Sequence, residues 1–190
     1  MVPAVQGPPA LYVRHAMAVP EDGTHPTTWV LDEEGRASAR AMAEQLEVGP
    51  RIGVVVASTE PKALATAEEI GAVWGVDVVG DDRLREAKRP WVGPGYRAVV
   101  HRYLRGEQHD GWEAHAAVAK RVGAVVDEAV EVSGERVAVI VSHGLTLALH
   151  LGERLGPEFD REWFWSSLAF PDAWLLDEQG LLHRCIRPTL

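Results

Sequence analysis

The sequence has very little cysteine: Cys185 is the single one among 190 residues, so no internal disulfide can form. A lone thiol fits a reducing compartment. Residues 1–10 contain no basic residue and no apolar core segment, and we therefore expect no secretory signal. Long apolar runs are also missing, since none approaches the roughly 20 residues that span a bilayer. We expect a cytoplasmic protein with no membrane partner.

Patterns that bind metal are absent as well. The eight histidines lack the close spacing of zinc ligands, and a lone cysteine does not indicate a zinc site. Acidic residues outnumber basic ones by 28 to 19, and the net charge of −9 argues against nonspecific binding to nucleic acid. We therefore expect no metal, no cofactor and no nucleic-acid partner.

The residues that are present favour one globular domain over 1–190. Hydrophobic residues make up 46% and charged residues 25%, and the chain is long enough to bury a core. Strands are predicted over 11–14, 52–57, 76–79 and 137–141, and helices over 33–46, 60–74, 96–104, 113–132 and 145–155. This alternation predicts an α/β fold, a three-layer α/β/α sandwich with a mostly parallel central sheet.

The ends of these segments carry further signals. Asp32 fits the N-cap of the first helix, and Ser58 or Thr59 fits that of the second. Residues 157–165 read as an aromatic-rich connection. Residues 167–186 predict two strands that add an edge to the sheet.

Two predicted strands end in a histidine. The first ends in Arg14 and His15, and the fourth is followed by Ser142, His143 and a glycine. Ligands of open α/β sheets lie at the carboxyl ends of the strands. A neutral imidazole can attack phosphorus, and a guanidinium can hold phosphoryl oxygens in a bidentate fork. These residues therefore predict a phosphate site at one edge of the sheet.

A lysine and a basic segment add to this prediction. Lys62 falls at a helix N-terminus next to a strand end, a natural phosphate position, although a lysine that points to solvent is the simpler alternative. Residues 83–105 hold seven of the 19 basic residues and a single acid. We interpret residues 81–111, with Trp91 and Tyr96, as an insert over the active site. A solvated surface segment is the alternative.

Five segments follow one another in a recognisable order. They are Val13-Arg14-His15-Ala16, Leu31-Asp32-Glu33-Glu34-Gly35, residues 57–67, Leu84-Arg85-Glu86 and Val141-Ser142-His143-Gly144. As an ordered set within residues 11 to 144, they resemble the motifs of the histidine phosphatase superfamily, also called phosphoglycerate mutase-like.

The resemblance implies a phosphoglycerate mutase-like fold in which His15 is the nucleophile and forms a phosphohistidine. Glu86 matches the family's acid, which protonates the leaving oxygen, and His143 completes the catalytic set. The phosphate-binding residues that it implies are Arg14, Ser58, Lys62 and His143. No metal is implied, because cationic side chains neutralise the phosphoryl charge. For Glu86, a structural ion pair with Arg83, Arg89 or another neighbour is the alternative.

Two positions depart from the family's pattern: Ala16 replaces the usual glycine, and Lys62 replaces the usual arginine. We expect a metal-independent phosphomonoesterase that acts on a small phosphorylated metabolite and releases inorganic phosphate. One alternative is a phosphoglycerate-type mutase, and another is a catalytically impaired phosphate-binding or regulatory protein. Dephosphorylation of phosphohistidine or another phosphoprotein is a further alternative. The run from Trp163 to Trp165 marks either a homodimer surface or packing beneath the terminal hairpin.

Overall fold

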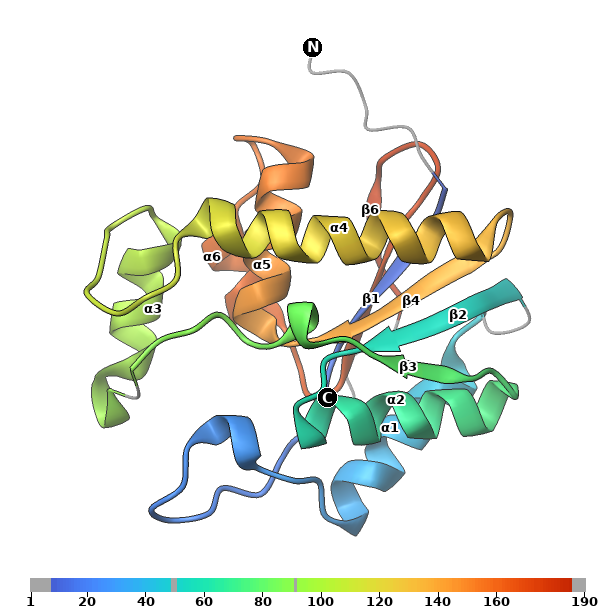
Figure 1. The fold of residues 1–190 in the computed structure, drawn as a ribbon, viewed down its shortest axis with the longest axis horizontal. Helices are drawn as coiled ribbons and strands as arrows, with labels where there is room; N and C mark the ends of the chain where they lie inside the picture. Colours follow the sequence, from blue (N-terminus) through green and yellow to red (C-terminus); the bar gives the residue numbers. More distant parts are fainter. Residues whose placement is uncertain (1–7, 49–50, 91, 186–190) are drawn as a thin grey trace.

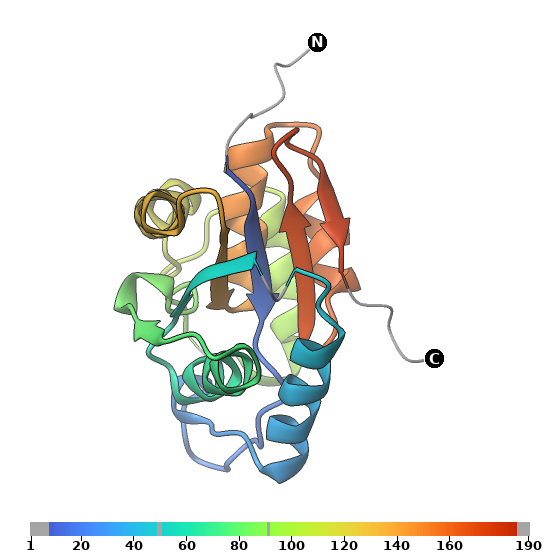
Figure 2. The ribbon, with the colours of Figure 1, turned by 90° about the vertical axis from the view of Figure 1, so that its right-hand side faces the viewer.

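The computed structural model describes residues 8–48, 51–90 and 92–185 (Figure 1). Within these residues, six strands form one sheet in the order β3-β2-β4-β1-β5-β6. The strands are β1 (Ala10–Arg14), β2 (Ile52–Ala57), β3 (Val78–Gly80), β4 (Val137–Ser142), β5 (Asp172–Leu176) and β6 (Leu182–Arg184). Strands β1 to β4 pair in parallel, whereas β5 pairs antiparallel with both β1 and β6. The predicted mostly parallel sheet is therefore confirmed, and Figure 2 shows β3 and β6 at its opposite edges.

Helices cover both faces of the sheet. They are α1 (Glu33–Gln45), α2 (Pro61–Trp74), α3 (Tyr96–Leu104), α4 (His115–Ser133), α5 (Gly144–Leu155) and α6 (Arg161–Ser167). Single 3₁₀ turns occur at η1 (Pro26–Thr28), η3 (Asp82–Leu84) and η4 (Gly93–Gly95). Helices α1 and α2 pack on one face, and α4 and α5, extended by α3 and α6, pack on the other. This arrangement is the predicted three-layer sandwich.

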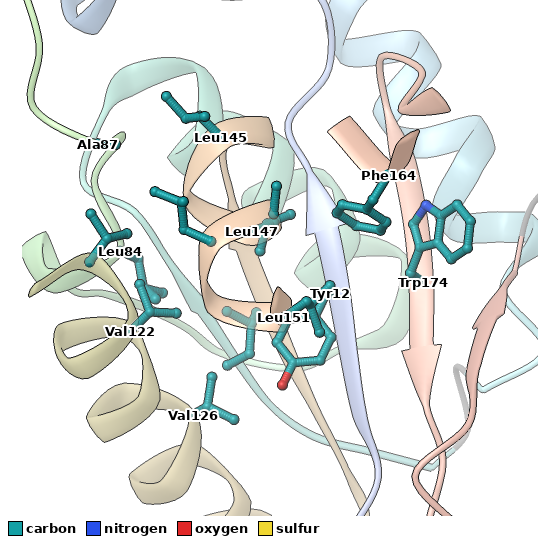
Figure 3. Packing of buried hydrophobic residues seen from close by; sticks show 14 of the residues in the cluster. Tyr12, Leu84, Ala87, Val122, Val126, Leu145, Leu147, Leu151, Phe164 and Trp174 are labelled. Carbon is teal, nitrogen blue, oxygen red and sulfur yellow. The ribbon is translucent and has the colours of Figure 1, made fainter. Parts of the chain in front are cut away.

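Alternation along β1 shows how the two layers share the sheet. Leu11 and Val13 point into the cluster with α1 and α2, whereas Tyr12 points into the cluster with α4 and α5. Figure 3 shows side chains from β1, α4, α5 and α6 meeting in this second cluster, among them Tyr12 and Phe164. Each fully buried apolar side chain of this size stabilises the fold by about 1.5–3 kcal/mol. The sandwich thus gives the strand ends a rigid support.

Two local predictions fail at helix starts. Asp32 caps α1 as expected, because its carboxylate accepts a hydrogen bond from Gly35 N at 2.8 Å. The N-cap of α2, however, is Glu60 and not Ser58 or Thr59, and its side chain makes no capping bond. The predicted connection over 157–165 contains the start of a helix, α6, because Asp160 accepts a hydrogen bond from Trp163 N. Of the three N-cap residues Asp32, Glu60 and Asp160, only Asp32 was predicted from the sequence.

The aromatic run in α6 is mostly internal. Phe164 is fully buried and Trp165 is 8% exposed, whereas Trp163 is 57% exposed. Packing within the fold therefore accounts for two of the three aromatic side chains, and the homodimer stays a prediction. None of the described helices combines the length and the apolarity that crossing a bilayer requires.

Candidate active site

The register of three parallel strands brings the predicted residues to one edge. Arg14 at the end of β1 lies opposite Ser142 of β4, and Ala57 at the end of β2 lies opposite Val141. The residues that follow these three strands, His15, Ser58 and His143, therefore lie at the same edge of the sheet. Backbone bonds continue the pairing, with His15 N donating to Ser142 O at 3.1 Å. As a result, the rings of His15 and His143 lie 5.1 Å apart between their centroids.

A single hydrogen bond fixes the chemistry of His15. Its Nδ1 lies 2.7 Å from the carbonyl oxygen of Ala16. A carbonyl only accepts, so Nδ1 carries the proton and Nε2 keeps a free lone pair. Burial, and then the neighbouring His143 and the charges of Lys62 and Arg14, hold the pKa of His15 well below its usual value. The ring is therefore a neutral imidazole near neutral pH.

Ala16 fits where the family usually has glycine. None of the non-glycine residues that the structure describes has a positive φ, so this position needs no left-handed backbone. Ala16 is fully buried, and its N–H donates to the hydroxyl of Thr66 at 3.0 Å. The alanine methyl group is therefore accommodated without backbone strain.

Arg14 is held rigidly beside His15. Its Nη1 donates to the carbonyl of Leu168 at 2.9 Å, and the guanidinium lies 3.4 Å above the ring of Phe170. Burial lowers the pKa of Arg14 to about 10, so the side chain stays charged at neutral pH. Its Nε is buried without a hydrogen-bond partner among the described residues. Sequence reasoning did not identify Phe170, which lies far from Arg14 in the chain.

His143 is buried and rests on Ser58. Its Nε2 lies 2.9 Å from the Ser58 hydroxyl, while its Nδ1 has no partner among the described residues. Burial, followed by the charges of Lys62 and Arg89, lowers the pKa of His143 well below its usual value. This ring is therefore also neutral, and it can act on a ligand only as a hydrogen-bonding group.

Lys62 lies in the first turn of α2, and protein groups already engage its charge. The ammonium donates to Glu60 Oε2 at 2.5 Å and to the carbonyl of Pro26 at 2.8 Å. Only 6% of Lys62 is exposed, so the alternative of a lysine pointing to solvent is wrong. An ammonium has three N–H donors, and the two protein contacts leave one of them for a ligand.

Glu60 is a cavity residue that the sequence prediction did not include. It is 8% exposed, and its Oε1 accepts a hydrogen bond from Glu86 N at 2.8 Å. The same oxygen lies 3.6 Å from His143 Nε2. The available signal was a glutamate inside the motif, two residues before Lys62. An acid is unexpected there, because the neighbouring positions were predicted to bind an anion.

Glu86 accepts several hydrogen bonds. Its Oε1 receives the Thr146 N–H and hydroxyl at 3.0 and 2.8 Å, and the Ala87 N–H at 2.9 Å. Arg89 lies 3.9 Å from the other oxygen. Burial raises the pKa of Glu86, but the Arg89 charge and these hydrogen bonds outweigh it, and the pKa falls below its usual value. In the free protein, Glu86 is therefore a carboxylate.

A cavity of about 200 Å³ opens at this edge of the sheet. Five of the six predicted site residues line it, and the sixth, Ser58, lies behind His143. The other lining residues are Met17, Ala18, Pro20, His25, Pro26, Thr27, Trp29, Glu60, Arg89, Tyr96, Trp165 and Phe170. Its charged groups are three cations, Arg14, Lys62 and Arg89, and two carboxylates.

Most of the basic segment lies away from this cavity. Arg83 pairs with Asp81 and Glu128, and Arg105 pairs with Glu162. Among the described residues of 83–105, Arg89 is the basic side chain that lines the cavity. Trp91 lies outside the described residues. Four of the seven basic residues of this segment, Arg83, Arg85, Arg102 and Arg105, thus form ion pairs with nearby carboxylates.

The chain is similar to known proteins in sequence and in fold. The model of the histidine phosphatase superfamily (branch 1) matches residues 11–167. No curated protein matches the chain. The structure of a mycobacterial glucosyl-3-phosphoglycerate phosphatase in complex with VO3 is similar, with a TM-score of 0.73, 22% identity, and coverage of 97% of this chain and 100% of that one.

Two further solved structures have the same fold. YhfR from Bacillus stearothermophilus has a TM-score of 0.69 at 19% identity, covering 97% of this chain and 98% of that one. A mutant phosphoserine phosphatase from Entamoeba histolytica, in complex with phosphoserine, has a TM-score of 0.64 at 16% identity, covering 93% of this chain and 94% of that one. At these identities the similarity concerns the fold.

Proposed function

Because the chain belongs to the histidine phosphatase superfamily (branch 1), we propose that it is a metal-independent phosphomonoesterase that works through a phosphohistidine on His15. The observation that carries this proposal is the unprotonated Nε2 of a neutral imidazole in a cavity that Arg14 and Lys62 also line. The similar structures of glucosyl-3-phosphoglycerate phosphatase and phosphoserine phosphatase support a reaction on phosphomonoesters. We place its action in the cytoplasm, on the basis of the single cysteine.

The proposed reaction has two displacements at phosphorus. In the first, a bond forms between His15 Nε2 and phosphorus and the phosphorus–oxygen bond to the alcohol breaks, while Glu86 passes a proton that the substrate's phosphoryl group brought with it to the alcohol oxygen. In the second, water attacks phosphorus, the nitrogen–phosphorus bond breaks, and Glu86 takes a proton from the water. Two easier steps replace one difficult step. Inorganic phosphate leaves, and His15 returns to its starting form.

Side chains around His15 neutralise the transferred group. Arg14, Lys62 and His143 contact the phosphoryl oxygens in this proposal, which removes the need for a metal ion. His143 Nδ1 and Arg14 Nε are buried without partners among the described residues, and phosphoryl oxygens would serve as their acceptors. Ser58 contributes by holding His143 Nε2.

The cavity also favours a small substrate. Its volume of about 200 Å³ fits a phosphoryl group with a short alcohol portion. We propose that the insert over 81–111 closes this space from one side, since Arg89 and Tyr96 line the cavity. Apolar walls from Trp29, Trp165 and Phe170 would contact the alcohol portion. A phosphorylated metabolite is therefore preferred over a phosphoprotein.

One observation favours a second candidate, a phosphate-binding protein with little turnover. Lys62 already pairs with Glu60, which reduces the positive charge available to the transition state. Ala16 no longer supports this candidate, because its backbone is unstrained. The mutase alternative differs in its product, which is an isomer of the substrate and not free phosphate.

Hydrolysis of 4-nitrophenyl phosphate with excess chelator, from pH 5 to 8, tests the proposal. We expect the native protein to turn over, and His15→Ala to lose at least about a thousandfold in rate, because the covalent route is closed. His25→Asn is the matched control, since His25 is an exposed histidine at the cavity wall. Activity that survives in His15→Ala, or that needs added metal, would contradict the proposal. Phosphate binding without turnover would favour the second candidate.

A further inference from the structure

Glu60 puts a negative charge where an anion is expected to bind. It is the N-cap residue of α2, yet its side chain turns away from the helix and lines the cavity. Its Oε2 contacts Lys62 and its Oε1 lies 3.6 Å from His143, the same two side chains that the proposed function assigns to phosphoryl oxygens. The approach to His143 is on Nε2, opposite the Nδ1 that is proposed to contact phosphate, so the closeness comes through Lys62. A phosphoryl oxygen bound to the Lys62 ammonium lies near Glu60 Oε2, because the same ammonium already donates to that oxygen.

Two bare anions repel each other at such a distance, and the cavity walls screen this repulsion less than water does. A proton between the carboxylate and a phosphoryl oxygen converts the repulsion into a strong, charge-assisted hydrogen bond. Each carboxylate oxygen of Glu60 makes one hydrogen bond to the protein, and a carboxylate accepts about four in total. Glu60 thus keeps lone pairs for a P–O–H donor.

We infer that Glu60 is a specificity-determining residue that selects a phosphoryl group carrying a proton, the monoanion, over fully ionised oxyanions. This inference rests on the proposed function of the same cavity. It names the substrate form, a singly charged phosphomonoester, that the cavity accepts. Fully ionised tetrahedral anions of the same shape bind more weakly, because the carboxylate repels them.

The charges of the whole cavity agree with this selection. The titratable groups that line the cavity with Glu60 are Lys62 on α2, His143 after β4, Arg14 and His15 at the end of β1, and Glu86 and Arg89 after η3, together with His25 and Tyr96 at the wall. With His15 and His143 neutral, the three cations Arg14, Lys62 and Arg89 and the two carboxylates give these groups a net charge of plus one. A monoanion balances this charge and a dianion exceeds it.

The state of Glu86 gives additional support. Its carboxylate is ionised in the free protein, so it holds no proton for a leaving oxygen before substrate binds. A substrate monoanion brings one proton, which stays on the phosphoryl oxygen beside Glu60 until the phosphorus–oxygen bond to the alcohol breaks, when Glu86 passes it to the alcohol oxygen. The alcohol portion of the substrate then leaves as a neutral molecule without a proton drawn from solvent.

Binding of inorganic phosphate and sulfate at about pH 6, measured by titration calorimetry, tests the inference directly. The two anions share a tetrahedral shape, but phosphate carries a proton under these conditions and sulfate does not. We expect native protein to prefer phosphate by at least about tenfold, and Glu60→Gln to reduce this preference by at least about tenfold. A glutamine amide donates to a bare oxygen and still accepts from Glu86 N.

Glu69→Gln is the matched control. Glu69 lies on the same helix, is similarly buried at 7% exposure, and pairs with Arg36 and Arg40 away from the cavity. Its substitution should leave the ratio of the two affinities unchanged. An unchanged ratio in Glu60→Gln, or a native protein that binds sulfate as well as phosphate, would overturn the inference. A native protein that binds neither anion would instead contradict the proposed function.

The native protein alone provides a second measurement, which does not depend on a variant that folds. If the monoanion binds, the affinity for methylphosphonate, whose dianion has no P–O–H, should fall as the pH rises past its second pKa, while the affinity for sulfate stays nearly constant. Methylphosphonate affinity that rises over the same pH range would show a preference for the dianion. That result would overturn the inference even if Glu60→Gln were unstable.

Discussion

At the scale of single residues, hydrogen bonds decide which groups can react. The carbonyl of Ala16 fixes the proton of His15 on Nδ1, so that Nε2 is the nucleophilic atom. Thr146 and Arg89 keep Glu86 ionised in the free protein. Both groups therefore start without a proton at the reacting atom, which suits His15 as the nucleophile but leaves Glu86 without the proton that the alcohol oxygen needs. Bound phosphate must therefore change the state of Glu86, because a nearby negative charge raises the pKa of a carboxyl group.

Glu86→Gln separates a proton donor from a binding group through the choice of leaving group. An alkyl phosphate releases a strongly basic oxygen, so we expect its kcat/KM to fall by about a hundredfold to ten-thousandfold. An aryl phosphate releases a weakly basic phenolate, so its kcat/KM should change by less than about tenfold. The two substrates are compared on the same protein preparation. Equal losses for both would show that Glu86 acts in binding and not as the acid.

The sequence motifs correctly predicted which residues lie close together in the structure. Arg14, His15, Lys62 and His143 do share one cavity. The interaction between Lys62 and Glu60 was not predicted. Helix periodicity does not indicate whether the side chain of the N-cap residue contacts a side chain in the first turn. The contact of Ser58 with His143 was likewise not predicted, since it joins two distant segments.

At the scale of elements, strand ends and one glycine place the cavity groups. Gly144 begins α5 directly after His143, and the side chain of Arg14, from the end of β1, packs against it. A Cβ at this position would lie 3.2 Å from Arg14 Nε and 3.4 Å from a methyl carbon of Leu168. The absence of a side chain at Gly144 thus leaves room for the guanidinium. This is a packing requirement, and no special backbone angle is involved.

Gly144→Ala should lower activity without lowering stability. Alanine stabilises a helix by about 0.5–1 kcal/mol relative to glycine, while the added methyl group displaces Arg14. We expect kcat/KM for 4-nitrophenyl phosphate to fall about tenfold, a loss typical of a weakened charge-assisted contact. Thermal unfolding and kinetics of the same samples provide the measurement.

Gly123→Ala is the control for this element. Gly123 lies within α4, and a Cβ there would meet His150 at an ordinary contact distance of 3.9 Å. The Gly123→Ala protein should gain thermal stability and keep the native kcat/KM. A Gly144→Ala protein with unchanged kinetics would contradict the assigned position of Arg14.

The elements themselves were largely predictable. Apolar runs bounded by turns predicted β1, β2 and β4 to within a residue at each end, because these strands are buried on both faces. The third strand was predicted over 76–79 but occupies Val78–Gly80, since Val76 N bonds back to Gly71 O at the end of α2. Helix α6 was missed, because seven residues are too few for a periodic pattern to show.

At the scale of the whole molecule, one sheet edge collects groups from distant parts of the chain. The rule for parallel strands predicted that His15 and His143 would meet, and the register of β1 with β4 brings this about. The far wall of the cavity was not predictable, because Trp29 and Phe170 arrive on loops whose paths depend on the complete fold. His25, an exposed loop residue, also lies at the cavity wall.

The central claim is that the phosphoryl group passes through His15. The most direct measurement is rapid mixing with an excess of aryl phosphate, quenching in base, and location of the bound phosphoryl group by mass spectrometry. Base is used because phosphohistidine is hydrolysed in acid. We predict a phosphoryl group on His15 that acid removes, which is absent from His15→Ala and present in His25→Asn. Rapid turnover with no phosphorylated protein, or with the phosphoryl group on another residue such as His143, would contradict the account.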